Sequence, residues 1–323
     1  MRRVASIGGV SLLAIVMLAA WPVWLVVGGV VDFMRRKFRL PTVRLLAFAL
    51  CWSWIELGGV LGAAWLWVSG RRRNLQAHFA LQRSWAGALM TALRYTVGIR
   101  IRVENPEVLR PGPVLVFSRH ASLADSLVSA YAVGNIAGLN PRYVLKRELM
   151  ADPCLDIVGH RLPNYFLDRG SNNQSDELRG IARLGENLGE HDVAVIFPEG
   201  TRSNPAKRSK VLASMVERSP ERARRLASLA HLLPPKPAGA LSLLEAAPDA
   251  DVVIAGHTGF DGLDTFGGIL RRLESGAGDG RMWFRRIPRA EVPADGIVEW
   301  LDKTWLDLDV EVATRTNPNG GVV

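Results

Sequence analysis

The feature that most constrains the fold of this chain is an uninterrupted apolar run near its start. No charged residue occurs from Val4 to Val31. At about 1.5 Å rise per residue, a helix of that length is long enough to cross a hydrocarbon layer about 30 Å thick. The run therefore predicts a transmembrane helix over residues 4–31. A secretory signal peptide is the alternative, but the run is overlong for one and the segment around Ala19 is a poor cleavage site.

A second apolar run extends over residues 45–68 and contains one ionisable residue, Glu56. Its tryptophans lie toward the two ends, where aromatic side chains favour the membrane interface; they are Trp52, Trp54, Trp65 and Trp67. The two runs together predict a hydrophobic helical hairpin that makes residues 1–73 a membrane anchor. The Glu56 carboxyl is expected either to be protonated or to face the partner helix, or else to mark a functional site within the membrane.

Basic residues flank both apolar runs, and the formal net charge of the chain is +9. The flanking residues are Arg2, Arg3, Arg35, Arg36, Lys37, Arg39, Arg44 and Arg71 to Arg73. Because they lie on both sides of the runs, the excess of positive charge does not choose an orientation. A hairpin that dips into one leaflet fits them as well as one that spans the bilayer. Membrane lipids are the expected partners, and nucleic acid is not, because no nucleic-acid-binding module is recognisable.

The remainder of the chain, residues 74–313, has the pattern of one α/β domain. Short apolar runs typical of buried strands occupy residues 114–117, 193–197 and 251–255. Patterns with helical spacing predict helices over residues 75–98, 123–133, 175–188 and the basic insert 203–232. The Gly/Asn-containing tail, residues 314–323, is predicted to be disordered. The only cysteines, Cys51 and Cys154, show no ligand spacing, so no metal site is predicted.

A histidine and an aspartate follow the first predicted strand of this domain. His120 and Asp125 are separated by four residues, with the aspartate at the entrance to a helix. The carboxylate can then reach one imidazole nitrogen and fix the tautomer, which leaves the other nitrogen to deprotonate a hydroxyl. The pair is a candidate general-base dyad. The alternative is a helix-capping aspartate beside an ordinary loop histidine.

A second polar block follows the next predicted strand and reads Phe-Pro-Glu-Gly-Thr-Arg-Ser over residues 197–203. With the earlier His-x4-Asp block, it resembles the glycerolipid acyltransferase family that includes the 1-acylglycerol-3-phosphate acyltransferases. The resemblance covers roughly residues 114–203 and implies an α/β fold with a mixed sheet flanked by helices. It implies that His120 and Asp125 are catalytic. It also implies substrate-binding roles for the later block, namely Glu199, Gly200, Thr201 and Arg202.

Two further segments are similar to blocks of that family. The segment that ends in Arg169 is similar to one whose arginine binds the acceptor phosphate, and Lys146 lies in a segment similar to the family's lysine-rich one. Lys146 is expected either to steady an oxyanion or the phosphates of a carrier, or to be a solvated surface residue. The chain departs from the family at Arg119, where many members carry asparagine, and near His257, where the family's proline is missing. His257 is interpreted as a structural histidine or a second base.

The resemblance implies an O-acyltransferase that moves a fatty acyl group onto lysophosphatidate, with acyl-CoA or acyl carrier protein as donor and no cofactor. His120 would remove the hydroxyl proton as that oxygen attacks the thioester. The expected location is the cell membrane, with the catalytic domain on the cytoplasmic side. Two alternatives stay open: the same chemistry on glycerol 3-phosphate, a lysophospholipid or a glycolipid, and a lipid-binding protein without activity.

Overall fold

The centre of the structure, a computed structural model, is a mixed β-sheet of the expected α/β class. The structure describes residues 2–168, 170, 173–261, 263, 265–276 and 278–316. Within these, seven strands form one sheet in the order β1-β7-β6-β2-β5-β3-β4. They are β1 (Ile101–Glu104), β2 (Val114–Ser118), β3 (Asn140–Lys146), β4 (Tyr165–Leu167), β5 (Asp192–Ile196), β6 (Asp251–Thr258) and β7 (Gly280–Ile287). The mixed sheet flanked by helices is confirmed.

The five strands from β6 to β4 run parallel, whereas β7 is antiparallel to β6 and parallel to β1. In the parallel part, alternate side chains of one strand enter two different apolar cores. Val114 and Val116 of β2 face one core, while Leu115 and Phe117 face the other. All four side chains are fully buried. Burial on both faces explains why the strands read as continuous apolar runs rather than as alternating ones.

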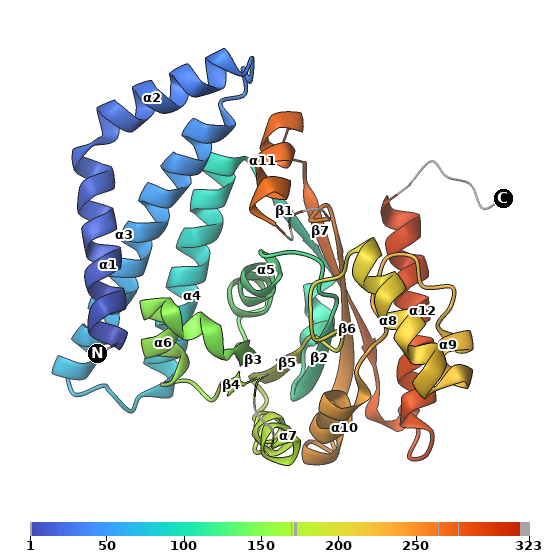
Figure 1. Ribbon diagram of the computed structural model, residues 1–323. Helices are drawn as coiled ribbons and strands as arrows, with labels where there is room; N and C mark the ends of the chain where they lie inside the picture. The colour runs from blue at the N-terminus through green and yellow to red at the C-terminus, as the bar shows by residue number, and fades with distance from the viewer. Residues whose placement is uncertain are drawn as a thin grey trace.

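Helices cover both faces of the sheet (Figure 1). They are α4 (Leu75–Ala92), α5 (Asp125–Ala130), α6 (Pro153–Gly159), α7 (Gln174–Ala182), α8 (Pro205–Arg218), α9 (Pro220–Arg225), α10 (Pro237–Ala246), α11 (Phe266–Ser275) and α12 (Ile297–Thr316). Wider π-helical turns η1 (Leu93–Val97) and η3 (Tyr131–Ile136) continue α4 and α5. Short 3₁₀ turns are η2 (Pro106–Leu109), η4 (Arg147–Ala151) and η5 (Arg289–Glu291).

The N-terminal apolar region differs from the single helix predicted over residues 4–31. The run divides at Ala20 into α1 (Arg2–Ala19) and α2 (Trp21–Met34). Pro22 lies in the first turn of α2, the position where a missing N–H is tolerated, and its ring prevents a continuous helix. The second run forms α3 (Pro41–Val68), which begins four residues before the expected start.

By length and composition, α1 and α3 are the two described helices that could cross a membrane, and α2 is shorter. Figure 1 shows α1 alongside α3, with α2 crossing at one end. Large apolar side chains are exposed along these helices, including Leu12, Ile15, Leu61 and Trp65. The predicted apolar hairpin is therefore compatible with the structure.

The hairpin is joined to the rest of the molecule by polar contacts. Asp156 of α6 has a buried side chain, and its carboxylate accepts hydrogen bonds from Arg2 at 2.9 Å and Arg3 at 2.8 Å. Within α3, Glu56 is fully buried and accepts the indole N–H of Trp85 at 2.7 Å. Glu56 therefore contacts α4 and, through the backbone N–H of Cys154, α6, so these hydrogen-bond partners lie outside the predicted hairpin.

Two helices differ in extent from the sequence expectations. The helix expected over residues 175–188 ends at Ala182, where the backbone N–H groups of Leu184 and Gly185 bond to carbonyls three residues back, instead of four. The helix expected over 123–133 begins at Asp125 and continues through η3.

The predicted disordered tail is wrong for residues 314–316, which belong to α12. Arg315 pairs with Glu104 of β1 at 2.5 Å and lies over the Trp283 ring, and these contacts hold the last turn of the helix. Residues 317–323 of that prediction lie outside the described residues.

Candidate active site

The two sequence blocks meet at one edge of the sheet. β2 pairs with β5 on one side and with β6 on the other, all in parallel. The loop after β2 carries His120, and the loop after β5 carries Glu199. Carboxyl ends of parallel strands are where α/β proteins gather their ligand-binding residues. The predicted site residues after β2 and β5 are therefore neighbours in space.

His120 and Asp125 form the predicted contact. Nδ1 of His120 lies 3.0 Å from Oδ2 of Asp125, and the same oxygen accepts the backbone N–H groups of Ala121 at 2.5 Å and Ser122 at 2.7 Å. The second oxygen accepts the Ser122 hydroxyl. Asp125 is thus both the first residue of α5 and the orienting partner of the imidazole. A proton held at Nδ1 leaves Nε2 of His120 as the basic nitrogen.

The environment keeps this pair in the charge states that a general base requires. Burial lowers the pKa of His120, with Lys146 and Arg202 acting in the same direction and Asp125 opposing them. Burial alone would raise the pKa of Asp125, but its interactions with His257 and His120 outweigh this and hold that pKa below its usual value. An ionised aspartate therefore orients a histidine that is unprotonated at neutral pH.

Glu199 lies behind the histidine rather than in contact with solvent. Its carboxylate accepts the backbone N–H of His120 at 2.7 Å and that of Leu233 at 2.9 Å, and the side chain is almost completely buried. Burial raises the pKa of Glu199 to about 8, although both backbone hydrogen bonds oppose the rise. The family resemblance implies a substrate-binding role for Glu199. The structure instead places its carboxylate on the backbone of the loop that carries His120.

The residues that follow Glu199 form a cationic turn next to the imidazole. Gly200 has a φ of 66°, in the left-handed region that favours glycine, and a side chain there would meet Lys236. Thr201 and Arg202 are half-buried. Nη1 of Arg202 is buried and has no hydrogen-bond partner among the described residues. An unpaired guanidinium nitrogen beside a basic histidine suits an anionic group of a ligand.

Of the remaining predicted residues, Lys146 ends β3 and is close enough to His120 to influence its pKa. Arg169 lies outside the described residues. Two further residues adjoin the site: Lys236, which the sequence does not assign to it, and His257, interpreted from sequence as a structural histidine or a second base. Lys236 belongs to the region after the basic insert, and its backbone N–H donates to Pro198 at 2.8 Å. His257 lies in β6, with Nε2 3.5 Å from Asp125.

The basic insert serves in part as structure. Arg222 binds the buried carboxylate of Asp302 on α12 through contacts of 2.7 to 3.0 Å, and Arg225 contacts the same group at 3.0 Å. Lys207 donates to the backbone carbonyl of Arg202 at 3.1 Å. The start of the insert therefore adjoins the cationic turn, while its end fastens α9 to α12.

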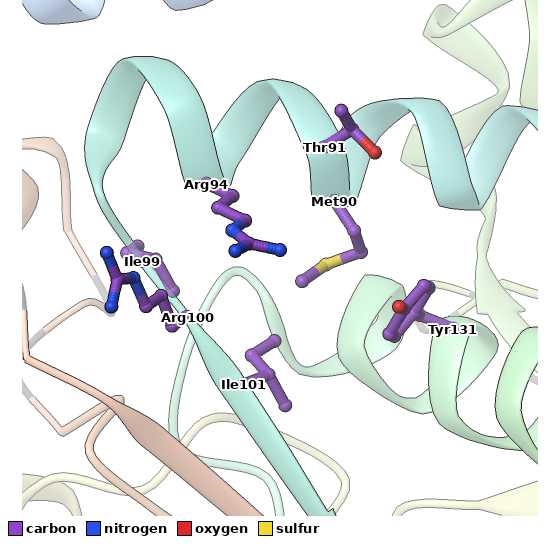
Figure 2. A pocket seen from close by; sticks show the side chains of 7 residues that line it. All are labelled: Met90, Thr91, Arg94, Ile99, Arg100, Ile101 and Tyr131. Carbon is purple, nitrogen blue, oxygen red and sulfur yellow. The ribbon is translucent and has the colours of Figure 1, made fainter.

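A pocket of about 280 Å³ lies away from these residues, between α4, η1, β1 and η3. Figure 2 shows Arg94 and Met90 projecting into it from the helix above, opposite Ile101, with Tyr131 at one side. None of its lining residues belongs to the candidate site.

Comparisons with known proteins agree with the geometry at the sheet edge. Residues 100–256 match the family model described as Acyltransferase, a span that contains the dyad and the whole second block. Residues 100–256 of the chain therefore belong to the glycerolipid acyltransferase family. The sequence resemblance to this family is thereby confirmed.

Two curated relatives of this family are similar to part of the chain. A probable 1-acyl-sn-glycerol-3-phosphate acyltransferase of Mycoplasma pneumoniae is 28% identical over 118 residues, 35% of this chain and 42% of the relative. A lyso-ornithine lipid O-acyltransferase of Rhizobium meliloti is 26% identical over 108 residues, 33% of this chain and 34% of the relative. The chain thus matches less than half the length of either relative.

Among solved structures, the 1-acyl-sn-glycerophosphate acyltransferase PlsC of Thermotoga maritima is similar over the whole of both chains. Its TM-score is 0.48 and its sequence identity 16%.

Proposed function

We propose that the protein is an O-acyltransferase that transfers a fatty acyl group from a CoA or carrier-protein thioester to the free hydroxyl of lysophosphatidate. The observation that carries this proposal is the dyad of His120 and the buried Asp125, with basic groups around the imidazole. The match to the acyltransferase family and the activities for which the two relatives are named support the same chemistry.

The reaction follows from the chemistry of the dyad. Nε2 of His120 removes the proton of the acceptor hydroxyl as the oxygen attacks the thioester carbonyl. The tetrahedral intermediate then collapses, the carbon–sulfur bond breaks, and the departing thiolate takes the proton from the imidazolium. Asp125 stabilises that imidazolium and keeps the ring oriented. No covalent acyl-enzyme is needed, and a general base of this kind contributes about 10² to 10⁴ in rate.

Arg202 is the proposed ligand of the acceptor phosphate, together with Arg169, whereas Lys146 is proposed to steady the oxyanion or the phosphates of the acyl carrier. The support is strongest for Arg202, because its buried Nη1 has no hydrogen-bond partner among the described residues. A guanidinium offers a phosphate two parallel hydrogen bonds, whereas a lysine offers a single charged point. A phosphorylated acceptor would then be oriented with its hydroxyl toward His120.

Membrane association is proposed for α1, α2 and α3, with the catalytic unit on the cytoplasmic side, where acyl thioesters are made. Their exposed apolar side chains are the support. A hairpin that enters one leaflet accommodates the basic residues at both ends of these helices, and a spanning hairpin is the alternative.

The test is acyl transfer from labelled palmitoyl-CoA, or from palmitoyl-acyl carrier protein, by protein purified in detergent. The acceptor panel contains lysophosphatidate, glycerol 3-phosphate, a lysophospholipid and lyso-ornithine lipid, the last because one relative bears that name. Transfer to lysophosphatidate that disappears in His120→Ala supports the proposal. Transfer only to another panel member establishes the same chemistry on that acceptor. Folded protein that transfers to none, from either donor, would favour a lipid-binding protein without activity.

A further inference from the structure

A second histidine lies on the far side of the catalytic aspartate. His257 is in β6, which pairs with β2, and its side chain is buried. Its Nε2 lies 3.2 Å from the backbone carbonyl of Arg119 and 3.5 Å from Oδ1 of Asp125. We propose that His257 is a positioning residue, which fixes the Asp125 carboxylate and, through it, the basicity of His120. The inference rests on the proposed function, in which His120 is the base.

The surroundings of His257 select one tautomer. Nε2 faces two oxygen acceptors, whereas Nδ1 is buried with no hydrogen-bond partner among the described residues. A buried N–H without an acceptor is costly, but a bare ring nitrogen is less so. The proton therefore belongs on Nε2, and the imidazole is a donor toward both Arg119 and Asp125.

The unusual residue before the catalytic histidine holds this arrangement in place. Arg119 is buried, and its guanidinium donates to the backbone carbonyl of His257 at 2.5 Å and to the carboxylate of Asp261 at 2.5 Å. His257 in turn approaches the carbonyl of Arg119, so the two segments bind each other reciprocally. The ring of Phe260 meets the His257 imidazole edge-on at 5.5 Å and limits its rotation.

Asp125 then has donors on both oxygens. Oδ2 receives His120 and two backbone N–H groups, while Oδ1 receives the Ser122 hydroxyl and faces His257. A carboxylate that shares its negative charge with a second imidazole exerts a weaker pull on the proton of the first. His257 thereby moderates how strongly Asp125 stabilises protonated His120, besides preventing the carboxylate from rotating.

The charged and titratable groups around the dyad determine the sign of the effect. These are Arg119, Lys146, Glu199, Arg202, Asp261 and Asp125 itself. Among them, Asp125 raises the pKa of His120, while Lys146 and Arg202 lower it. Removing the His257 donor concentrates the Asp125 charge on His120. The pKa of His120 should therefore rise, and the acidic limb of the pH–rate profile should move to higher pH.

The experiment compares His257→Leu with His257→Gln in the full-length protein in detergent. Leucine removes the donor, whereas the glutamine amide restores an N–H at nearly the reach of Nε2. The pKa of His120 is followed by NMR of protein labelled with ¹³C at the histidine rings, with the resonance assigned from a His120→Gln variant. Acyl-transfer kcat and KM are measured over the same pH range.

We expect His257→Leu to move the His120 titration and the acidic limb upward together, with kcat reduced about tenfold and KM unchanged. His257→Gln should retain the titration of the wild type. A His120 titration identical in all three proteins overturns the inference, as does an equal shift in both variants. Because the NMR measurement needs no substrate, it tests the role of His257 even if the wild type transfers no acyl group, a result that would count against the proposed function alone.

Discussion

The carboxylate of Glu199 accepts the backbone N–H of His120 at 2.7 Å, across 79 positions of sequence. This bond joins the two sequence blocks, because Glu199 faces the main chain of the loop that carries His120 and not the His120 imidazole. A second bond, to the backbone of Leu233, ties the segment after the basic insert to the same carboxylate. The acid of the second block is therefore the common support of two loops around the site.

Glu199→Gln should loosen both loops. Glutamine has one acceptor oxygen for two backbone donors, so one buried N–H loses its partner, which costs about 1–3 kcal/mol of unfolding free energy. Activity should fall as the His120 loop relaxes. Urea unfolding followed by tryptophan fluorescence measures the loss. The exposed Glu217→Gln on α8 is the matched control, and equal stability of the two variants would contradict this role.

The raised pKa of Glu199 should also make the stability of the protein depend on pH. The pKa of Glu199 is raised by burial from 4.5 to about 8, so between those values the folded protein holds a proton that the unfolded chain has released. Its contribution to stability is complete below pH 4.5 and is lost as pH rises toward 8. Unfolding midpoints in urea should therefore decrease over this interval in the wild type. The Glu199→Gln variant should lack that component, and parallel pH curves for both proteins would exclude the raised pKa.

Substitution of His120 should affect rate far more than stability. His120→Ala should lower kcat by about two to four orders of magnitude with little change in KM, because the base acts in the transition state. Asp125→Asn should also reduce kcat, since an amide cannot accept all the donors around Asp125. Steady-state kinetics with circular dichroism as the folding control measures both. Full activity in folded His120→Ala would rule out the general-base mechanism.

Arg202→Gln tests the proposed phosphate contact. Loss of a charged hydrogen bond to substrate should raise KM for a phosphorylated acceptor by about tenfold or more, with a smaller effect on an acceptor without phosphate. Arg208→Gln, further along in α8, serves as the control for loss of one positive charge. An equal rise in KM for both acceptors would show that Arg202 acts on the fold or the donor.

Introducing charged residues into α1 of the hairpin tests membrane association. Leu12 and Ile15 of α1 are 64% and 59% exposed. Changing both to glutamate should weaken binding to phospholipid vesicles at least tenfold, because a charge within the apolar layer costs about 2–3 kcal/mol. Val310→Glu on α12 is the control, since Val310 is 65% exposed but lies on another helix. Flotation that is unchanged by the double substitution would exclude α1 from the membrane contact.

The parts of the fold with strong local patterns are predictable from sequence. β2, β5 and β6 are continuous apolar runs, and the dyad of His120 and Asp125 follows from a spacing of four residues at a helix start. The short strand β1, the edge strand β4 and the antiparallel β7 escape such a prediction, because they are stabilised by pairing across the sheet rather than by local pattern. The break at Ala20 is hidden because hydropathy outweighs the proline that follows it.

Contacts between distant segments are the least predictable part of the site. Nothing local indicates that Glu199 binds backbone at Leu233, or that Lys236 adjoins Gly200. From sequence, His257 is either a structural histidine or a second base, and its approach to Asp125 is not evident because that depends on β6 being the neighbour of β2. Arg119 is visible in the sequence as a departure from the family, but its hydrogen bonds to His257 and Asp261 are seen only in the structure.

The long helix α3 has one more consequence. Hydrogen bonds fasten α3 to the α/β domain at two points. Arg44 donates to the backbone carbonyls of Thr96 and Val97, and Glu56 accepts the indole N–H of Trp85. Such an attachment is rigid, unlike a flexible linker. The height and tilt of His120 above any lipid layer that the hairpin enters are set when the chain folds. In the proposed reaction, an acceptor lipid would therefore reach a stationary site by lateral diffusion, without a swinging movement of the domain.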